Sequence, residues 1–171
     1  MYVIENLLIG IVSGLTASGI ILFALYRCQP NIEISPYIAK HTTSDGEVQY
    51  GFKFLNKTRY PICDVSSMVQ IRTSVNVGDG KIFNVKGLMK GSIWHVPAYD
   101  KKDKDSHYAK RFYKAYDLKA EWSDGDAELE FIVMAKHQLS GISKVTKHTW
   151  YSKNNSIQVG QHEIGDSLEV G

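Results

Sequence analysis

Hydrophobic residues are distributed unevenly along the chain. Residues 7–26 form an uncharged run, LLIGIVSGLTASGIILFALY, whereas charged residues recur throughout the sequence after Arg27. A helix of about 20 residues rises about 30 Å, which matches the hydrocarbon core of a bilayer. The pattern predicts a transmembrane helix over residues 3–27 that is followed by a soluble domain.

A cleaved signal peptide is the alternative interpretation of this run. Such a peptide has a basic amino-terminal region, a shorter apolar core and a cleavage site of small residues. None of these is present, because Glu5 precedes the run and the first basic residues, Arg27 and Lys40, follow it. Basic residues that flank a membrane span remain preferentially in the cytoplasm. We therefore expect a single-pass membrane protein with a cytoplasmic carboxy-terminal domain.

Small residues are concentrated on one side of the predicted helix. Gly10, Gly14 and Ser18 are four residues apart, a spacing that lets two helices approach closely in lipid. Asn6 and Ser13 fall on the same side, and in a bundle of four or more copies they would line a narrow pore. The alternative is a single anchor without a pore. The residues predicted to form the oligomer contact or pore are Asn6, Gly10, Ser13, Gly14, Ala17 and Ser18.

Beyond the helix, apolar and polar residues alternate in short runs, which is typical of half-buried β-strands. The clearest run covers residues 48–54, and Pro36 restricts the preceding one to a sheet edge. Residues 116–122 and 129–135 are expected to form a hairpin, and Gly78-Asp79-Gly80 is expected to close another. The remaining predicted strands cover residues 32–34, 65–73, 81–85, 94–96, 145–151 and 157–159.

Short strands separated by turn residues predict an antiparallel sandwich or barrel. We expect a mainly β protein in which an immunoglobulin-like β-sandwich over residues 30–160 follows the helix. Residues 161–171 contain three acidic residues and no basic one, and we expect them to form a flexible acidic tail. The two cysteines, Cys28 and Cys63, are too few for a disulfide framework and suit a reducing compartment.

Residues 99–114, YDKKDKDSHYAKRFYK, interrupt the strand pattern. Ser106 could cap a short helix over residues 106–116. Basic groups beside exposed aromatic rings are typical of sites that bind nucleotides or single-stranded nucleic acid. The alternative is a solvated loop whose Phe112 and Tyr113 pack on the sandwich. The candidate ligand-binding residues are Lys101, Lys102, Lys110, Arg111, Tyr113 and Lys114.

Catalytic motifs are missing from the sequence. The six histidines show no metalloprotease or zinc-finger spacing, and no nucleophile-elbow motif occurs. His137 and His148 would lie on neighbouring strands, but no third ligand accompanies this pair. We interpret the histidines as surface residues and expect no enzymatic activity, no metal and no cofactor. The net charge of +2 argues against a general nucleic-acid coat.

The layout of one small-residue membrane helix followed by a β-domain resembles the small membrane effectors of bacterial nucleotide-signalling anti-phage defence, of the CBASS and Hailong types. The resemblance covers the whole layout and includes no signature motif, so it assigns no residue a role. It implies an inner-membrane protein whose β-domain senses a nucleotide or DNA oligomer made by a partner nucleotidyltransferase. Oligomers of such an effector would then breach the membrane.

Two functions follow as expectations. The first is a homo-oligomeric membrane effector, an ion channel or membrane-disrupting protein gated by a ligand or nucleic acid and active in antiviral defence. The second is a single-pass anchor that holds a β-sandwich interaction module at the membrane without forming a pore. The lipid bilayer and further copies of the chain are the expected partners of the first.

Overall fold

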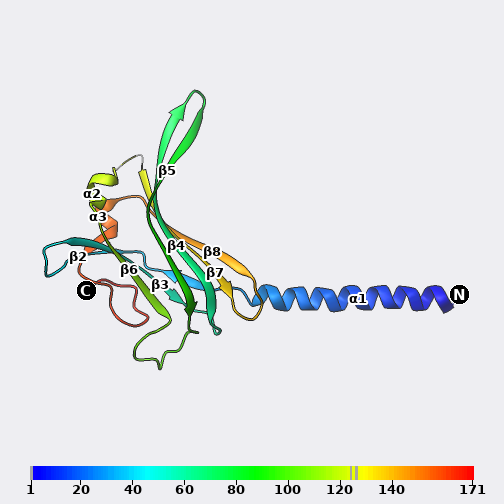
Figure 1. Ribbon diagram of the computed structural model, residues 1–171. Helices are drawn as coiled ribbons and strands as arrows, with labels where there is room; N and C mark the ends of the chain where they lie inside the picture. Colours follow the sequence, from blue (N-terminus) through cyan, green and yellow to red (C-terminus); the bar gives the residue numbers. More distant parts are fainter. Residues whose placement is uncertain (1, 124, 126) are drawn as a thin grey trace.

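The computed structural model describes residues 2–123, 125 and 127–171. Helix α1 (Tyr2–Arg27) has 26 residues and projects from the rest of the chain as an isolated rod (Figure 1). None of its residues is buried, and it is long and apolar enough to span a membrane. The predicted helix over residues 3–27 is therefore confirmed as a long apolar helix whose side chains the domain does not cover.

The rest of the chain folds into two β-sheets and two short helices, within the residues that the structure describes. The first sheet contains β1 (Ile32–Ile34), β2 (Ile38–Thr42), β3 (Val48–Asn56), β6 (Ala109–Ala115) and β9 (Ile157–Val159). The second contains β4 (Ile62–Val77), β5 (Gly80–Val96), β7 (Ala127–His137) and β8 (Ser143–Trp150). The short helices are α2 (Leu118–Glu121) and α3 (Lys153–Ser156).

Strand pairing confirms a mainly β fold with antiparallel sheets. In the first sheet, β3 pairs antiparallel with β1, β2 and β6, while β2 and β9 form a parallel pair. The second sheet has the order β5-β4-β7-β8 and is antiparallel throughout. Pro36 interrupts the edge of the first sheet between β1 and β2, as the sequence predicts.

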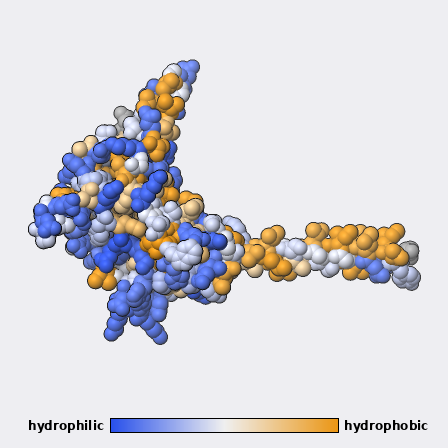
Figure 2. All heavy atoms as spheres, viewed as in Figure 1, coloured by the Kyte–Doolittle hydropathy of each residue, from blue (hydrophilic) through white to orange (hydrophobic). Residues whose placement is uncertain are grey.

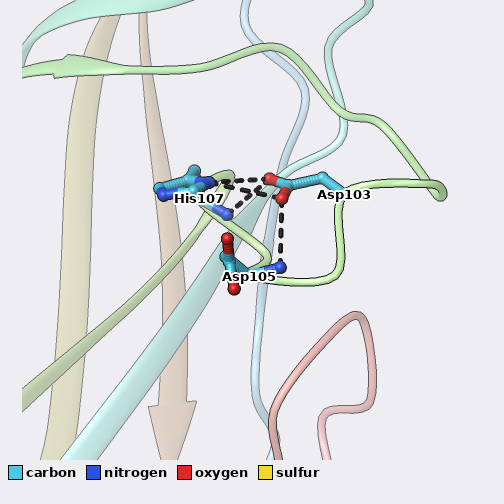
Figure 3. Close-up of side chains that lie close together, drawn as sticks. All are labelled: Asp103, Asp105 and His107. Atoms are coloured by element: carbon cyan, nitrogen blue, oxygen red, sulfur yellow. Dashed lines mark hydrogen bonds and ion pairs between the residues drawn. The ribbon is translucent and has the colours of Figure 1, made fainter.

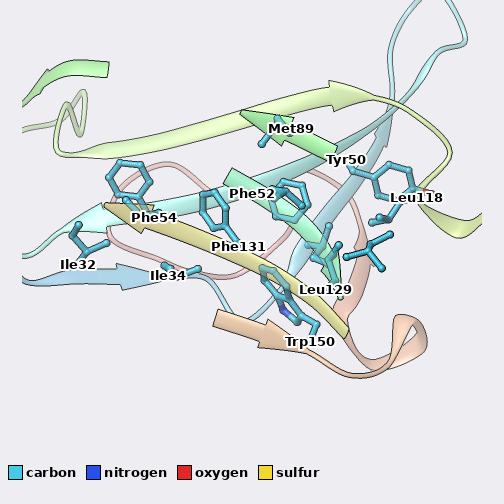
Figure 4. Packing of buried hydrophobic residues seen from close by; sticks show 14 of the residues in the cluster. Ile32, Ile34, Tyr50, Phe52, Phe54, Met89, Leu118, Leu129, Phe131 and Trp150 are labelled. Atoms are coloured by element: carbon cyan, nitrogen blue, oxygen red, sulfur yellow. The ribbon is translucent and has the colours of Figure 1, made fainter. Parts of the chain in front are cut away.

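The core lies between the two sheets and is built by alternating residues of the strands. Tyr50, Phe52 and Phe54 of β3 are buried, and Phe52 lies 5.4 Å from Phe131 of β7, measured between ring centroids (Figure 4). Trp150 of β8 lies 5.8 Å from the same Phe52 ring. Full burial of one such side chain contributes roughly 1.5–3 kcal/mol, so these contacts hold the sheets together.

The predicted hairpin of residues 116–122 and 129–135 is wrong. Asp117 accepts a hydrogen bond from the Ala120 N–H at 3.1 Å and starts the single turn of α2. Leu118 and Trp122, four residues apart, are both fully buried, and the Trp122 indole donates to the Ala127 carbonyl at 2.9 Å. Strand β7 pairs instead with β4 and β8. The Asp124 of the predicted turn lies outside the described residues.

Strands β4 and β5 form a hairpin much longer than the sequence predicts. Residues 81–85 and 94–96, expected as separate strands, belong to the single strand β5. The pairing shifts at Val69 of β4, which marks a β-bulge. Beyond the Thr73–Ala127 pair, β4 and β5 continue without a third strand from the described residues and project from the sandwich (Figure 1). We call this two-stranded projection, residues 74–85, the arm.

Residues 161–171 pack against the first sheet, unlike the flexible tail expected from the sequence. His162 and Val170 form a β-bridge, and the backbones of Gln161 and Gly171 exchange two hydrogen bonds of 3.0 Å. The Lys53 ammonium donates to the carbonyls of Glu163, Gly165 and Ser167 at 2.7, 2.9 and 2.6 Å. The acidic composition suggested solvation, but the backbone carbonyls of this segment bind a lysine of β3.

Candidate functional site

The hydroxyls of Ser13, Thr16 and Ser18 form hydrogen bonds within α1. Ser13 Oγ donates to the Gly10 carbonyl at 3.0 Å, and Ser18 Oγ donates to the Gly14 carbonyl at 2.8 Å. Thr16 makes the same kind of bond to Val12 at 2.8 Å. Because each of these three hydroxyls already has an acceptor within the helix, none of the three needs an external one in lipid or in a dry helix contact.

The glycines of α1 have open space around them. A Cβ atom added at Gly10, Gly14 or Gly19 would meet nothing within 4 Å. The folded chain therefore does not itself require glycine at these positions. Gly19 lies about 180° around the helix from Gly10, so it marks the opposite face. Figure 2 shows paler residues along one side of a helix that is otherwise strongly hydrophobic.

The β7–β8 loop contacts the end of α1. The Ser140 hydroxyl donates to the Cys28 carbonyl, and the Ser140 N–H donates to Nδ1 of His137 at 3.2 Å. His137 is 1% exposed, and burial lowers its pKa, which keeps it neutral as an acceptor. Strand β7 is thereby linked to the end of α1. A cavity of about 220 Å³ at this junction is lined by Ile21, Ala24, Leu25, Cys28, Leu139 and Ser140.

The second half of the predicted ligand segment forms strand β6 where the sequence suggested a short helix over residues 106–116. Phe112 packs on Phe54 with 5.9 Å between ring centroids, which is the packing expected from the loop alternative. Lys114 Nζ donates to the Leu88 carbonyl at 3.0 Å, and Arg111 Nη1 donates to the His162 carbonyl at 3.2 Å. The Tyr113 hydroxyl accepts from the His162 N–H at 3.3 Å. Three of the six candidate ligand residues are thus engaged inside the domain.

Lys101 and Lys102 lie in the loop before β6. They take no part in the contacts described for Arg111, Tyr113 and Lys114. Aspartates shape this loop, since Asp100 Oδ1 accepts from the Lys102 N–H at 2.8 Å. Lys110 is half-buried on β6. The six predicted residues therefore do not converge on one cavity.

Asp103, Asp105 and His107 form the one set of three potential metal ligands among the described residues (Figure 3). Asp103 accepts from the backbone N–H groups of Asp105 and His107 at 3.1 and 2.8 Å, and it lies 3.1 Å from His107 Nδ1. The hydrogen bond from the His107 N–H lowers the pKa of Asp103. Because the loop's own donors occupy this carboxylate, the cluster is explained as a turn.

A better candidate site lies at the end of the domain opposite α1, beside α2 and α3 (Figure 1). Two cavities of about 330 and 220 Å³ both include Lys40 of β2 and Lys119 of α2 in their walls. We call the two together the lysine pocket. Its other wall residues are Val48, Tyr50, Tyr116, Asp117, Lys153, Asn154, Ile157 and Val159.

The lysine pocket combines positive charge with aromatic walls. The Tyr116 hydroxyl is buried and has no hydrogen-bond partner among the described residues, and burial raises the pKa of Tyr116, so it remains a neutral donor. Burial also raises the pKa of Tyr50, with a smaller effect from Asp117. Lys153 Nζ donates to the Lys119 carbonyl at 2.9 Å. An anionic small molecule with a phosphate or carboxylate group suits these walls. Sequence reasoning missed the site because its lysines are far apart in the chain.

His95 and His107 are exposed, as expected, but two other histidines are not surface residues. His137 and His162 are 1% and 2% exposed. His148 pairs with Phe131, six residues along β7 from His137, which is roughly 20 Å at about 3.3 Å per residue. His137 and His148 therefore lie on neighbouring strands as predicted, but they are too far apart to share a metal.

Comparisons with known proteins find a distant structural similarity to a solved structure. No protein-family model and no curated protein sequence matches the chain. Among solved structures, the sporulation control protein Spo0M from Bacillus subtilis is similar to it with a TM-score of 0.41 and 14% sequence identity. The similarity covers 78% of this chain and 49% of Spo0M, so the chain spans about half the length of that protein. A likeness this distant carries no inference about function.

Proposed function

We propose that the protein is a homo-oligomeric membrane effector whose β-domain senses a ligand and whose α1 helices associate within a bilayer. The observation that carries the proposal is that α1 is uncovered and that Gly10 and Gly14, on its small-residue face, leave open space that no described part of the chain fills. In lipid, small residues allow close backbone approach between helices, and van der Waals packing then stabilises the association. A bundle of such faces would place Asn6 and Ser13 toward a central pore.

The lysine pocket replaces the predicted segment as the proposed sensor. A ligand opens or closes an assembly only if it binds one arrangement more tightly than the other. Strand β7 offers a connection, because it begins at Ala127 beside α2 and ends at His137, which contacts Ser140 next to α1. The family resemblance favours an anionic ligand of nucleotide type, made by a partner nucleotidyltransferase, and a role in anti-phage defence at the inner membrane.

Replacing both Gly10 and Gly14 with leucine tests the oligomer. We expect the variant to lose the higher-order species of the wild-type protein, since two leucines would hold neighbouring backbones apart. Native mass spectrometry of the full chain in detergent gives the copy number, and planar bilayers give the conductance. Thermal unfolding of the domain should not change, because both positions are open in the monomer.

The control is Gly19→Leu, which adds one leucine on the opposite face of α1, at a position that is equally open. We expect this variant to keep the wild-type copy number and conductance. Equal behaviour of the double variant, the control and the wild type would remove the oligomer proposal. It would favour the single-pass anchor with an interaction module, which the exposed apolar surface of the arm also supports.

The pocket is tested by charge reversal of Lys40 and Lys119. A charge-assisted hydrogen bond contributes about 1.5–3 kcal/mol, so loss of each lysine should weaken binding of an anion about tenfold or more. Adenosine monophosphate and inorganic phosphate serve as probes in calorimetric titrations. The control is Lys101→Glu with Lys102→Glu in the predicted segment. Weaker binding in the control alone would place the sensor at that segment.

A further inference from the structure

The arm exposes a group of large apolar side chains. Their exposed fractions range from 37% for Val75 to 57% for Val85. Figure 2 shows hydrophobic residues along the arm and hydrophilic ones at its tip. A surface of this kind, far from the core, is typical of a protein contact. The five residues are Val75, Val77, Ile82, Phe83 and Val85.

The apolar residues lie on both faces of the arm. Val75 pairs with Ile82 on one face, whereas Phe83 pairs with Ser74 on the other. Strand β7 ends its pairing at Thr73, so within the described part of the chain no third strand supports the arm. A two-stranded ribbon is marginally stable on its own in water. A contact that covers the arm would therefore stabilise it as well as bury its apolar surface.

The base of the arm is held by a buried carboxylate. Glu130 is 2% exposed and accepts from Arg72 and Gln70 at 2.8 Å each and from Lys147 at 3.1 Å. Burial alone would raise the pKa of Glu130, but these hydrogen bonds outweigh it and lower the pKa. The Arg72 guanidinium also lies 4.4 Å from the ring centroid of Phe83. These contacts tie the base of the arm, from which its direction is set, to the second sheet.

That direction suits a neighbouring copy. The arm projects sideways from the axis of α1 (Figure 1). If α1 crosses a bilayer, the arm extends along the membrane surface, where laterally associated copies of the chain lie. This step rests on the proposed membrane placement of α1, but it does not require a pore or a ligand.

The outer face of the second sheet offers a receptor for the arm. A groove of about 320 Å³ is lined by apolar Met68, Ile132, Met134 and Val145, with Lys90 at its edge. Asp79 and Lys81 at the arm tip and Lys90 at the groove are all exposed, and none of them forms an ion pair within the described residues, so the Asp79 side of the tip is the one that suits Lys90. Apolar strands facing an apolar groove, with opposite charges at the edge, make the two surfaces complementary.

We propose that the arm of one copy docks into this groove on the next copy. Such a contact is heterologous, because two different surfaces of the chain meet. Repeated around an axis along the membrane normal, it closes into a ring. The contact would set the spacing of the domains and, through them, of the α1 helices.

Cysteine crosslinking of the full chain tests the docking. Two variants, Val77→Cys and Val145→Cys, are made in a background in which Cys28 and Cys63 are serine. They are purified with different tags, mixed in nanodiscs and oxidised. We expect about tenfold more heterodimer than for the control pair Val77→Cys and Val159→Cys, because docking raises the effective concentration. Val159 is 85% exposed but lies on β9 of the other sheet.

The outcomes separate this inference from the proposed function. Adducts between two Val77→Cys copies, equal yields with the control pair, or a foreign protein occupying the arm in cells would each overturn the docking. An unchanged copy number without the specific adduct removes the arm contact and leaves the α1 oligomer standing. The double variant Val77→Glu with Ile82→Glu provides a second measurement. It should keep the wild-type unfolding temperature, since both residues are exposed, and should reduce the population of complete rings several-fold.

Discussion

Replacing Lys53 with methionine is expected to lower the free energy of unfolding by about 3 kcal/mol and to release residues 161–171 from the first sheet. Lys53 is 1% exposed, and its ammonium donates to three carbonyls of that segment. Burial and the neighbouring Arg111 lower the pKa of Lys53 to about 8, so the charged form still prevails at neutral pH. Methionine keeps the volume but leaves the carbonyls of Glu163, Gly165 and Ser167 without this donor.

Urea unfolding measures the loss, and hydrogen exchange of residues 161–171 locates it. The matched control is Lys57→Met, because Lys57 lies one residue beyond β3 and makes long ion pairs with Glu33 and Asp166 at 3.6 and 4.0 Å. Partly exposed pairs of this kind contribute less than about 1 kcal/mol. If the free energy of unfolding fell by the same small amount in both variants, Lys53 would not hold residues 161–171 on the first sheet.

Strands with a strong local signal could be predicted from the sequence. The alternation of Tyr50, Phe52 and Phe54 placed one face of β3 in the core, and the structure buries all three. The same alternation of apolar and polar residues predicted β7 and β8. Between the strands, the turn at Gly78 was correct because glycine accepts its positive φ of 56°.

Two elements were predicted wrongly because the hydrophobic periodicity of their sequences fits both a helix and a strand. In residues 106–116 the aromatic and basic residues fit a helix or a strand, and pairing of β6 with β3 over seven residue pairs decides for the strand. In residues 116–122 an alternating pattern concealed a helical one. Leu118 and Trp122 are four residues apart, and Asp117 is a favourable N-cap. This capping signal was present in the sequence and could have identified α2.

Long-range contacts explain what the sequence could not provide. The binding of Lys53 to residues 163–167 joins positions more than 100 residues apart. The lysine pocket likewise gathers Lys40, Lys119 and Lys153 from β2, α2 and α3. No spacing rule connects such residues, because they meet only when the sheet and the helices are in place.

His162 is expected to make the folded protein sensitive to acid. Its side chain is 2% exposed, and Nε2 lies 3.1 Å from the Gly51 carbonyl, so Nε2 carries the hydrogen. The other ring nitrogen, Nδ1, is buried and makes no hydrogen bond within the part of the chain that the structure describes. Burial, reinforced by the charges of Lys53 and Arg111, lowers the pKa of His162 to about 4. Protonation of Nδ1 would place a further positive charge in this buried site.

The direction of the pH effect follows from proton binding. Above pH 6.5 the imidazole is neutral in both states, and its full contribution to stability is present. Between pH 6.5 and about 4 the unfolded chain binds a proton that the folded chain does not, so the free energy of unfolding falls as the pH falls. At about 1.4 kcal/mol per pKa unit, this loss reaches roughly 3 kcal/mol.

His162→Gln keeps a donor for Gly51 but cannot titrate, so its urea-unfolding midpoint should depend less on pH than that of the wild type. His137 and His148, whose pKa values burial also lowers, titrate in both proteins and cancel in the comparison. The exposed His95→Gln variant should follow the wild type, and an equal loss in His162→Gln would show that another group causes the acid sensitivity.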